Sequence, residues 1–132
     1  EALIMEFPED LKYTKEHEWV RFDTTSGTAV MGITEFAQQE LGDIVFVELP
    51  NAGKSVAQND SVCVVESTKA ASDVYAPVGG VVAEVNESLS DAPEAINAAP
   101  YEAGWLVKLE QVSESDLDSL MDATAYRQLV GD

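Results

Sequence analysis

Lys69 is the side chain whose setting in the sequence best suits chemistry. It is the only lysine or arginine between Lys54 and Lys108, in a chain with 7 basic and 25 acidic residues. It lies in a small polar segment, Glu66 to Asp73, between two β-prone runs, and this pattern predicts a hairpin with Lys69 near its tip. A primary amine alone on a turn suits a carrier domain whose lysine an enzyme must find and acylate. The local pattern taken alone also describes an ordinary solvated surface lysine, which is the commoner case.

The single cysteine and the single histidine of the chain give little indication of a reactive or metal-binding site. The chain has one cysteine, Cys63, and one histidine, His17, so it cannot form an internal disulfide. A zinc site would need mostly carboxylate ligands, which is uncommon. Cys63 lies in an all-apolar run, which predicts a small buried thiol. His17 titrates near neutral pH, but no nucleophile lies near it in the sequence, so we expect it on the surface or facing a partner.

The charge balance excludes several classes of protein. The formal net charge is −18, and such a surface repels phosphate backbones and anionic lipid headgroups, so we expect neither nucleic-acid nor membrane binding. No apolar run approaches the roughly 20 residues of a membrane span, and the first residues lack the basic start and apolar core of a signal peptide. The acidity either keeps the protein soluble or steers it toward a basic patch on a partner.

The elements around Lys69 are mostly short strands separated by Gly, Pro and Asn turns. Thr34 is a good N-cap for one short helix, Glu35 to Leu41, and Gly42 suits its end. The remaining pattern predicts strands at about 16–22, 28–33, 43–49, 62–65, 74–76, 81–85 and 105–110. Such a series predicts a mostly antiparallel β domain, either a two-sheet sandwich or a flattened barrel. A weak duplication, with Pro and Gly before a valine strand on each side of the Lys69 hairpin, supports this class.

Two local patterns give more detailed expectations. Alternation along 16–22 predicts one strand face with His17, Trp19 and Arg21 and an opposite face with Glu18, Val20 and Phe22. We expect Trp19 and Trp105 in the core or in the wall of a cleft.

The two ends of the chain differ from its centre. We expect residues 1–10 to be a lead-in, with Met5 as the native start and 1–4 left from cloning. Residues 11–132 form a single domain whose C-terminal helices begin at about 113. Ser113 and Asp116 resemble a capping box, and a last short helix is predicted over about Ala123 to Val130.

Five stretches in register carry a family resemblance that runs from about residue 11 to residue 131. They are KYTKEHEWV at 12–20, GITEFAQ at 32–38, LGDIVFVELP at 41–50, VESTKAASDVYAP at 65–77 and GWLVK at 104–108. Together they resemble the glycine cleavage system H protein family, whose fold is a lipoyl-domain-like barrel-sandwich hybrid with short flanking helices. The departures are small: Thr68 stands where many members have Val, and none of the departures touches Lys69.

The resemblance implies a carrier that is not itself an enzyme. Lys69 would bear lipoic acid in amide linkage. A pyridoxal-phosphate-dependent glycine decarboxylase would load an aminomethyl group on the arm, and a tetrahydrofolate-dependent aminomethyltransferase would take it over. Dihydrolipoamide dehydrogenase would reoxidise the dithiol, and a lipoate ligase or a lipoyl/octanoyl transferase would install the cofactor.

The resemblance also implies roles for residues around the lysine. The turn that presents Lys69 consists of small or polar neighbours, namely Glu66, Ser67, Thr68, Ala70 and Asp73. Glu66 and Asp73 flank the turn and are candidates either for reading by the ligase or for holding the arm. Glu18 and Asp73 match positions lining a cleft that shields the loaded arm from water, and His17 lies beside them in sequence. Glu16 stands where some members have Ser, so the contact that this Ser makes with the arm in those members is not expected here.

Three other interpretations stay open at this point. The chain is alternatively a biotinyl or lipoyl domain of another complex. A biotin carrier usually has Met on both sides of the lysine, where this chain has Thr68 and Ala70, and lipoyl domains of 2-oxoacid dehydrogenases are shorter and often have Asp before the lysine. It is alternatively a relay that passes lipoyl or octanoyl groups to other proteins. An enzyme using Lys69 as a Schiff-base nucleophile would need a desolvated pocket, which the polar turn does not predict. We expect a bacterial cytoplasmic location, or the mitochondrial matrix if the chain is a processed eukaryotic form.

Overall fold

The protein is a mostly β structure built from two antiparallel sheets, seen here in a computed structural model that describes residues 5–131. The larger sheet has six strands in the order β1-β2-β3-β9-β8-β5, and the smaller has three in the order β4-β6-β7. Its strands are β1 (Lys12–Tyr13), β2 (Glu18–Asp23), β3 (Thr28–Ile33), β4 (Ile44–Glu48), β5 (Ser55–Val56), β6 (Ser61–Ser67), β7 (Ala71–Tyr75), β8 (Gly80–Val85) and β9 (Val107–Glu110). The predicted fold class is confirmed, and of the two architectures left open the structure has the open sandwich rather than a closed barrel.

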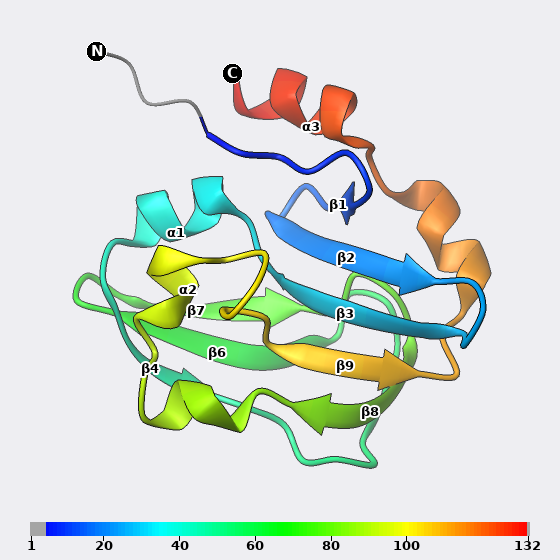
Figure 1. Cartoon of the computed structure of the whole chain (residues 1–132), viewed down its shortest axis with the longest axis horizontal. Helices are drawn as coiled ribbons and strands as arrows, with labels where there is room; N and C mark the ends of the chain where they lie inside the picture. Colours follow the sequence, from blue (N-terminus) through cyan, green and yellow to red (C-terminus); the bar gives the residue numbers. More distant parts are fainter. Residues whose placement is uncertain (1–4, 132) are drawn as a thin grey trace.

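The two sheets lie one behind the other and share an apolar core (Figure 1). Both contribute fully buried side chains, such as Met31 and Leu109 from the larger sheet and Val65 from the smaller. The duplicated sequence segments meet directly, since Ser55 in β5 pairs with Val81 in β8. The Lys69 hairpin, β6–β7, therefore projects from one end of the sandwich, beside α1 (Figure 1).

The helices are short and lie at the edges of the sandwich. They are α1 (Glu35–Leu41), η1 (Glu87–Ser90), α2 (Ala95–Ala98), η2 (Glu114–Ser119) and α3 (Ala123–Val130), η being a 3₁₀ helix. α1 has the predicted bounds: the Thr34 side chain accepts a hydrogen bond from the Ala37 amide, and Gly42 ends the helix at φ 83°. α3 also has its predicted bounds.

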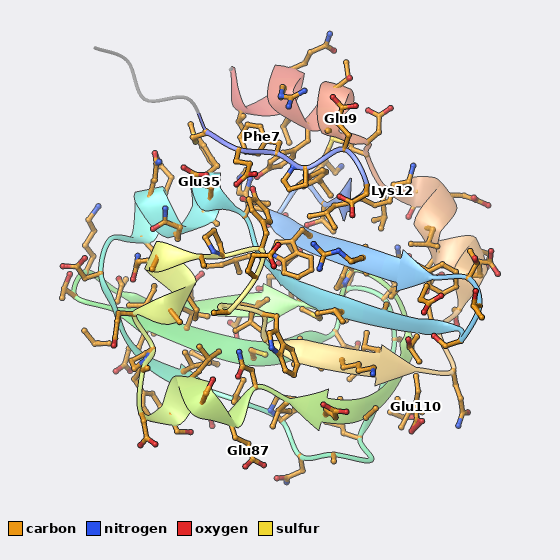
Figure 2. The ribbon with its side chains drawn as sticks, viewed as in Figure 1. Phe7, Glu9, Lys12, Glu35, Glu87 and Glu110 are labelled. Carbon is orange, nitrogen blue, oxygen red and sulfur yellow. The ribbon has the colours of Figure 1, made fainter. Side chains whose placement is uncertain are left out.

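A second, mainly aromatic cluster joins the two ends of the described chain. The Tyr13 and Tyr126 rings stack at 4.7 Å between centroids, and Phe7 meets Tyr126 edge-on at 5.2 Å. Figure 2 labels Phe7 on the lead-in, next to α3. Trp19 is buried in this cluster and donates from its indole nitrogen to the Pro100 carbonyl at 3.0 Å. The cluster anchors α3 beside β1 and β2, as expected for packing residues in the tail.

Two local expectations about the strands were wrong. His17 is not part of a strand, because β2 begins at Glu18 and His17 adopts φ 75°. It therefore does not share the predicted strand face with Trp19 and Arg21, although Arg21 does lie over the Trp19 ring at 5.3 Å. The hairpin break is shorter than the polar segment, because strand pairing continues through Glu66 opposite Ala71. Small polar residues are tolerated there since the ladder uses backbone groups rather than side chains.

The predicted capping box in the tail is also wrong. Ser113 precedes η2 but its side chain makes no capping hydrogen bond. Asp116 turns away from the helix and accepts from the Gly79 amide at 2.9 Å, so a tertiary contact replaces the local one. Residues 1–4, which we expected to precede the native start, lie outside the described residues.

Candidate carrier site

The hairpin turn is fixed by one side chain, Ser67. Its backbone amide donates to the Ala70 carbonyl at 2.9 Å, which closes the turn. Its hydroxyl oxygen accepts from the amides of Lys69 and Ala70 at 3.1 and 3.2 Å and lies 3.1 Å from the Ala70 carbonyl, to which it donates. Ser67 is only 7% exposed. A Ser hydroxyl that satisfies the backbone of a tight turn holds it without bulk, so the position of Lys69 is defined by its own hairpin.

Lys69 projects from this turn into solvent. Its side chain is exposed, and its ammonium donates to the Glu40 carbonyl at the end of α1 at 3.1 Å. The neighbouring Thr68 amide donates to the Asp43 carbonyl at 3.1 Å, which ties the turn to the start of β4. Thr68 and Ala70 are exposed and small. An acylating enzyme therefore meets no side-chain obstacle at the amine.

The two flanking acids lie on the hairpin but at different distances from its tip. Glu66 is exposed at the last pairs of the ladder, opposite Phe46 on one side and Ala71 on the other. Asp73 lies further along β7 and accepts a hydrogen bond from the Ser61 hydroxyl at 2.9 Å. Of the predicted lysine neighbours, Ser67, Thr68 and Ala70 form the turn itself, and Glu66 flanks it.

A cleft of about 260 Å³ lies on the other side of the hairpin and brings together the three residues predicted to line it. These are His17, Glu18 and Asp73. The cleft is also lined by residues that the sequence did not single out for it, namely Ile33, Phe36, Ala37, Glu40, Leu41, Ser72 and Val74, and by Glu16. Its walls come from the segment before β2, from α1 and from β7, and the end of α1 also accepts the hydrogen bond of the Lys69 ammonium. An arm rooted at Lys69 therefore has an apolar and acidic cleft beside it.

Glu18 is a buried carboxyl within this cleft. It is 2% exposed, accepts from the Tyr75 amide at 3.0 Å and from the Thr14 hydroxyl, and so is no solvated surface group. Burial raises the pKa of Glu18 above its ordinary value, while the Thr14 and Tyr75 hydrogen bonds act in the opposite direction and the charge of Glu16 adds to the rise. The carboxyl therefore cross-links the segment before β2 to the end of the Lys69 hairpin.

His17 is held by a hydrogen-bonded chain that reaches the C-terminal helix. Its Nδ1 lies 2.7 Å from the Tyr126 hydroxyl, which lies 2.8 Å from the Thr34 hydroxyl. The Thr34 oxygen already accepts from the Ala37 amide. Every donor finds an acceptor when Thr34 donates to Tyr126 and Tyr126 donates to His17 Nδ1, which leaves the proton of a neutral His17 on Nε2. Burial lowers the pKa of His17, against the opposing charges of Glu16 and Glu40, in agreement with a neutral ring.

Tyr126 is the functional-site residue that sequence reasoning missed most clearly. It is fully buried, and burial raises its pKa to about 12. It lies 109 residues from His17 in the sequence, and its position in a predicted tail helix indicated packing only. Glu40 and Phe36 were easier to predict as neighbours of each other, since both lie on the predicted helix 35–41, where residues three or four apart share a face. No short-range signal placed that helix against the hairpin.

Other kinds of site find no support in the part of the chain that the structure describes. Within residues 5–131 no group of three or more metal-ligating side chains is placed to hold a metal ion. Among the helices described, none has the length and apolar character needed to cross a membrane. Cys63 is buried as predicted, and burial raises the pKa of its thiol to about 12, so it is an unreactive core residue at neutral pH.

The fold and the site together define a class: a β-sandwich that presents a lysine on a tight hairpin turn beside a cleft. The comparisons with known proteins specify it further. The family model "Glycine cleavage H-protein" matches residues 11–132, and the chain belongs to this family.

Relatives agree over nearly the whole length. The glycine cleavage system H protein of Anaeromyxobacter sp. (strain K) is 57% identical over 127 residues, covering 96% of this chain and 97% of that protein. The H protein of Escherichia coli O7:K1 (strain IAI39 / ExPEC) is 54% identical over 125 residues, covering 95% and 96%. The crystal structure of an H protein from Mycobacterium marinum has a TM-score of 0.87 at 38% identity, covering 96% of this chain and all of that one.

Proposed function

We propose that this protein is the lipoyl-bearing shuttle of a glycine cleavage system and has no catalytic activity of its own. The observation that carries the proposal is Lys69, exposed on a turn fixed by Ser67, in a chain that belongs to the glycine cleavage H-protein family. A lipoyl group in amide linkage there supplies a sulfur pair that accepts the aminomethyl group of glycine and changes between disulfide and dithiol. The partners are glycine decarboxylase, the aminomethyltransferase, dihydrolipoamide dehydrogenase and the enzyme that attaches the lipoyl group.

The residues present fit such a group. The Lys69 side chain is exposed, and its turn is held by the hydrogen bonds of Ser67. The residues before and after it in the sequence, Thr68 and Ala70, are small. The cleft beside it combines the apolar side chains of Ile33 and Phe36 with four acids. These are Glu16, Glu18, Glu40 and Asp73. An apolar wall with carboxylates suits an arm that ends in a cationic amine, since the wall excludes water and a carboxylate pairs with the ammonium.

The residues of this chain then have separate roles. Ser67 holds the root of the arm, and Asp73 and Glu18 present carboxyl groups to the cleft. His17 presents a neutral ring whose Nδ1 is occupied by Tyr126. Since the relatives named above are bacterial proteins, we place the shuttle in a bacterial cytoplasm.

The test is the mass of tryptic peptides from protein isolated from its native cells. Trypsin cuts after unmodified lysine, so lipoylation of Lys69 blocks that cut. A single peptide from Ser55 to Lys108 carrying the lipoyl mass is the expected result, and the Lys69→Arg variant, whose residue 69 remains cleavable, serves as the control. Complete tryptic cleavage after Lys69, in protein isolated from cells that make lipoate, would contradict the carrier function.

The glycine cleavage role has its own measurement. The lipoylated protein isolated from its native cells is mixed with glycine decarboxylase and labelled glycine. The amount of label bound to the protein is then measured. We expect binding that depends on Lys69. Lipoylated protein that accepts no label from glycine would retain the carrier function and refute the glycine cleavage role.

A further inference from the structure

The smaller sheet exposes two consecutive large apolar side chains, Val45 and Phe46. Their exposed fractions are 51% and 55%, and the only other large apolar side chain this exposed within residues 5–131 is Leu129, at 48%. β4 is an edge strand of the smaller sheet. An exposed aromatic ring next to an exposed valine on a sheet edge is unusual for a protein that works as a free monomer. We call these two residues the β4 patch.

A β-bulge produces this exposure. Ile44 pairs with Ser67 and Phe46 pairs with Glu66, so Val45 is an extra residue on β4. Without the bulge, alternation along the strand would turn Val45 toward the opposite face from Phe46. A bulge at a sheet edge re-aims side chains. Here it places both apolar residues in solvent while Ile44 stays buried.

The β4 patch lies at the same end of the molecule as Lys69. Phe46, Glu66 and Ala71 form one cross-strand row on the outer face, immediately before the turn. The strand preceding the patch also touches the turn, because the Asp43 carbonyl accepts from the Thr68 amide. A protein that covers Lys69 from the β4 side therefore covers the β4 patch as well.

The surroundings of the β4 patch are acidic. Asp43, Glu48 and Glu66 are exposed around it, and Lys69 is the cation at this end of the hairpin. The three carboxylates outnumber the one ammonium, so the surface around the apolar residues is negative before any acylation. The complementary surface is therefore an apolar pocket bordered by Lys and Arg side chains.

We propose that the β4 patch is the docking contact for the enzyme that acylates Lys69, with Phe46 inserted into an apolar pocket bordered by basic side chains. The inference rests on the proposed function. In the acylation step the Lys69 amine attacks an activated acyl group, an acyl-phosphate anhydride or a thioester. A C–N bond forms, the bond to the phosphate oxygen or thiol sulfur breaks, and the ammonium protons pass to the leaving group or to solvent.

The reach of the lysine selects this enzyme among the partners. Before acylation, the reacting nitrogen lies 3.1 Å from the backbone carbonyl of Glu40. An active site that encloses it must therefore contact the surface next to the hairpin. Once the arm is attached, the reacting sulfurs are at the end of a long chain, so later partners reach them without covering the β4 patch. Aromatic side chains at the centre of an interface typically provide much of its binding energy.

The experiment measures acylation of the unmodified full-length chain by a purified bacterial lipoate ligase with ATP and octanoate. The variants are Phe46→Ala and Val45→Thr, and Leu129→Ala is the matched control because Leu129 is similarly exposed, on α3. We expect Phe46→Ala to raise KM at least tenfold, Val45→Thr to raise it less, and both to leave kcat nearly unchanged. Leu129→Ala should match the unaltered protein. Equal KM values for Phe46→Ala and the unaltered chain would overturn the proposal.

A competition assay separates docking from any effect of Phe46→Ala on the fold. The Lys69→Arg variant accepts no acyl group and should inhibit acylation of the unaltered protein. Adding Phe46→Ala to it should abolish inhibition, whereas adding Leu129→Ala should not. Inhibition by the Lys69→Arg/Phe46→Ala protein equal to that of Lys69→Arg would overturn the proposal, as would a finding that Phe46→Ala merely converts a dimer of this chain into monomers. If the unaltered chain is never acylated, the proposed function itself fails, which is a different result.

Discussion

The turn at Lys69 and the cleft beside it are built in opposite ways. The turn at Lys69 is exposed, and its geometry depends on contacts of Ser67 within three residues along the chain. The cleft is assembled from segments far apart in sequence, with Glu18 joined to Tyr75 and His17 joined to Tyr126. A turn with local contacts stays rigid while its tip remains free, whereas a shielding cleft requires buried polar groups that the whole fold must satisfy.

The difference separates two functions that the proposed carrier must combine. Attachment of the arm depends on an accessible and locally ordered lysine. Retention of a cargo depends on water exclusion and on fixed polar groups, which only tertiary structure supplies. Substitutions in the turn should therefore change acylation, and substitutions in the cleft should change stability and cargo retention. Each prediction below tests that separation.

Glu18→Ala should have the largest effect on stability. It leaves the Tyr75 amide and the Thr14 hydroxyl without their acceptor, and each such loss costs about 1–3 kcal/mol. The removal of a buried carboxyl offsets part of this, so we expect the free energy of unfolding to fall by about 2–4 kcal/mol in urea titration. Glu16→Ala, an exposed residue of the same cleft, should change it by less than about 0.5 kcal/mol. Slower ligase acylation of folded Glu18→Ala would contradict the separation.

Ser67→Ala should act on the turn instead. It removes the acceptor of two amides and the donor to Ala70, at a cost of about 1–2 kcal/mol. We expect faster amide hydrogen exchange at residues 69 and 70 and a lower kcat/KM for acylation of Lys69. Ser61→Ala, at the far end of the same strand, is the control. Unchanged exchange at the turn would show that the backbone pairing alone holds Lys69.

The sequence predicted the turn better than the cleft for the same structural reason. The hairpin, the helix 35–41 and the last helix follow from turn residues, N-caps and apolar periodicity within short windows. Both helices have their predicted bounds, and the hairpin lies where it was predicted, with a shorter break between its strands. The H-protein resemblance supplied Glu18, His17 and Asp73 as cleft residues, and the structure brings them together.

Other features depended on tertiary contacts that no local pattern contains. The alternation along 16–22 suggested that His17 continues a strand, but its amide donates to the Thr14 carbonyl at 3.1 Å in a turn before β2, where His17 has φ 75°. Ser113 and Asp116 had the spacing of a cap, yet Asp116 binds the Gly79 amide instead. The bulge that exposes Val45 likewise arises from the pairing of β4 with β6. It could not be predicted from the sequence, because Val45 lies in an uninterrupted apolar run.

Tyr126→Phe tests whether α3 contributes to the cleft through His17. The change removes the hydroxyl between His17 and Thr34 and should cost about 1 kcal/mol of stability. In ¹⁵N NMR spectra we expect His17 of the unaltered protein to carry its proton on Nε2, and His17 of the variant to populate both tautomers. Acylation of Lys69 should not change. Tyr75→Phe, whose hydroxyl is outside this network, is the matched control, and an unchanged His17 tautomer in Tyr126→Phe would refute the assignment.

The smallest effects concern pH, where Glu18 and His17 should act in opposite directions. The folded-state pKa of Glu18 is raised above 4.5 by burial, so the folded protein binds more protons than the unfolded chain above pH 4.5. Stability from this group is therefore complete below pH 4.5 and falls as pH rises through the raised pKa. The folded-state pKa of His17 is lowered below 6.5 by burial. Its contribution is complete above pH 6.5 and is lost as pH falls through the lowered pKa.

Two variants separate these contributions in urea unfolding between pH 4 and pH 8. Glu18→Gln should gain stability relative to the unaltered protein as pH rises above 4.5, and His17→Asn should gain as pH falls below 6.5. Asn suits position 17 because it tolerates the positive φ found there. We expect each difference in the free energy of unfolding to grow across its pH window, because a shifted folded-state pKa makes the stability depend on pH there. Parallel pH profiles for all three proteins would mean that neither the Glu18 carboxyl nor the His17 ring is buried. The cleft would then be as solvated as the turn.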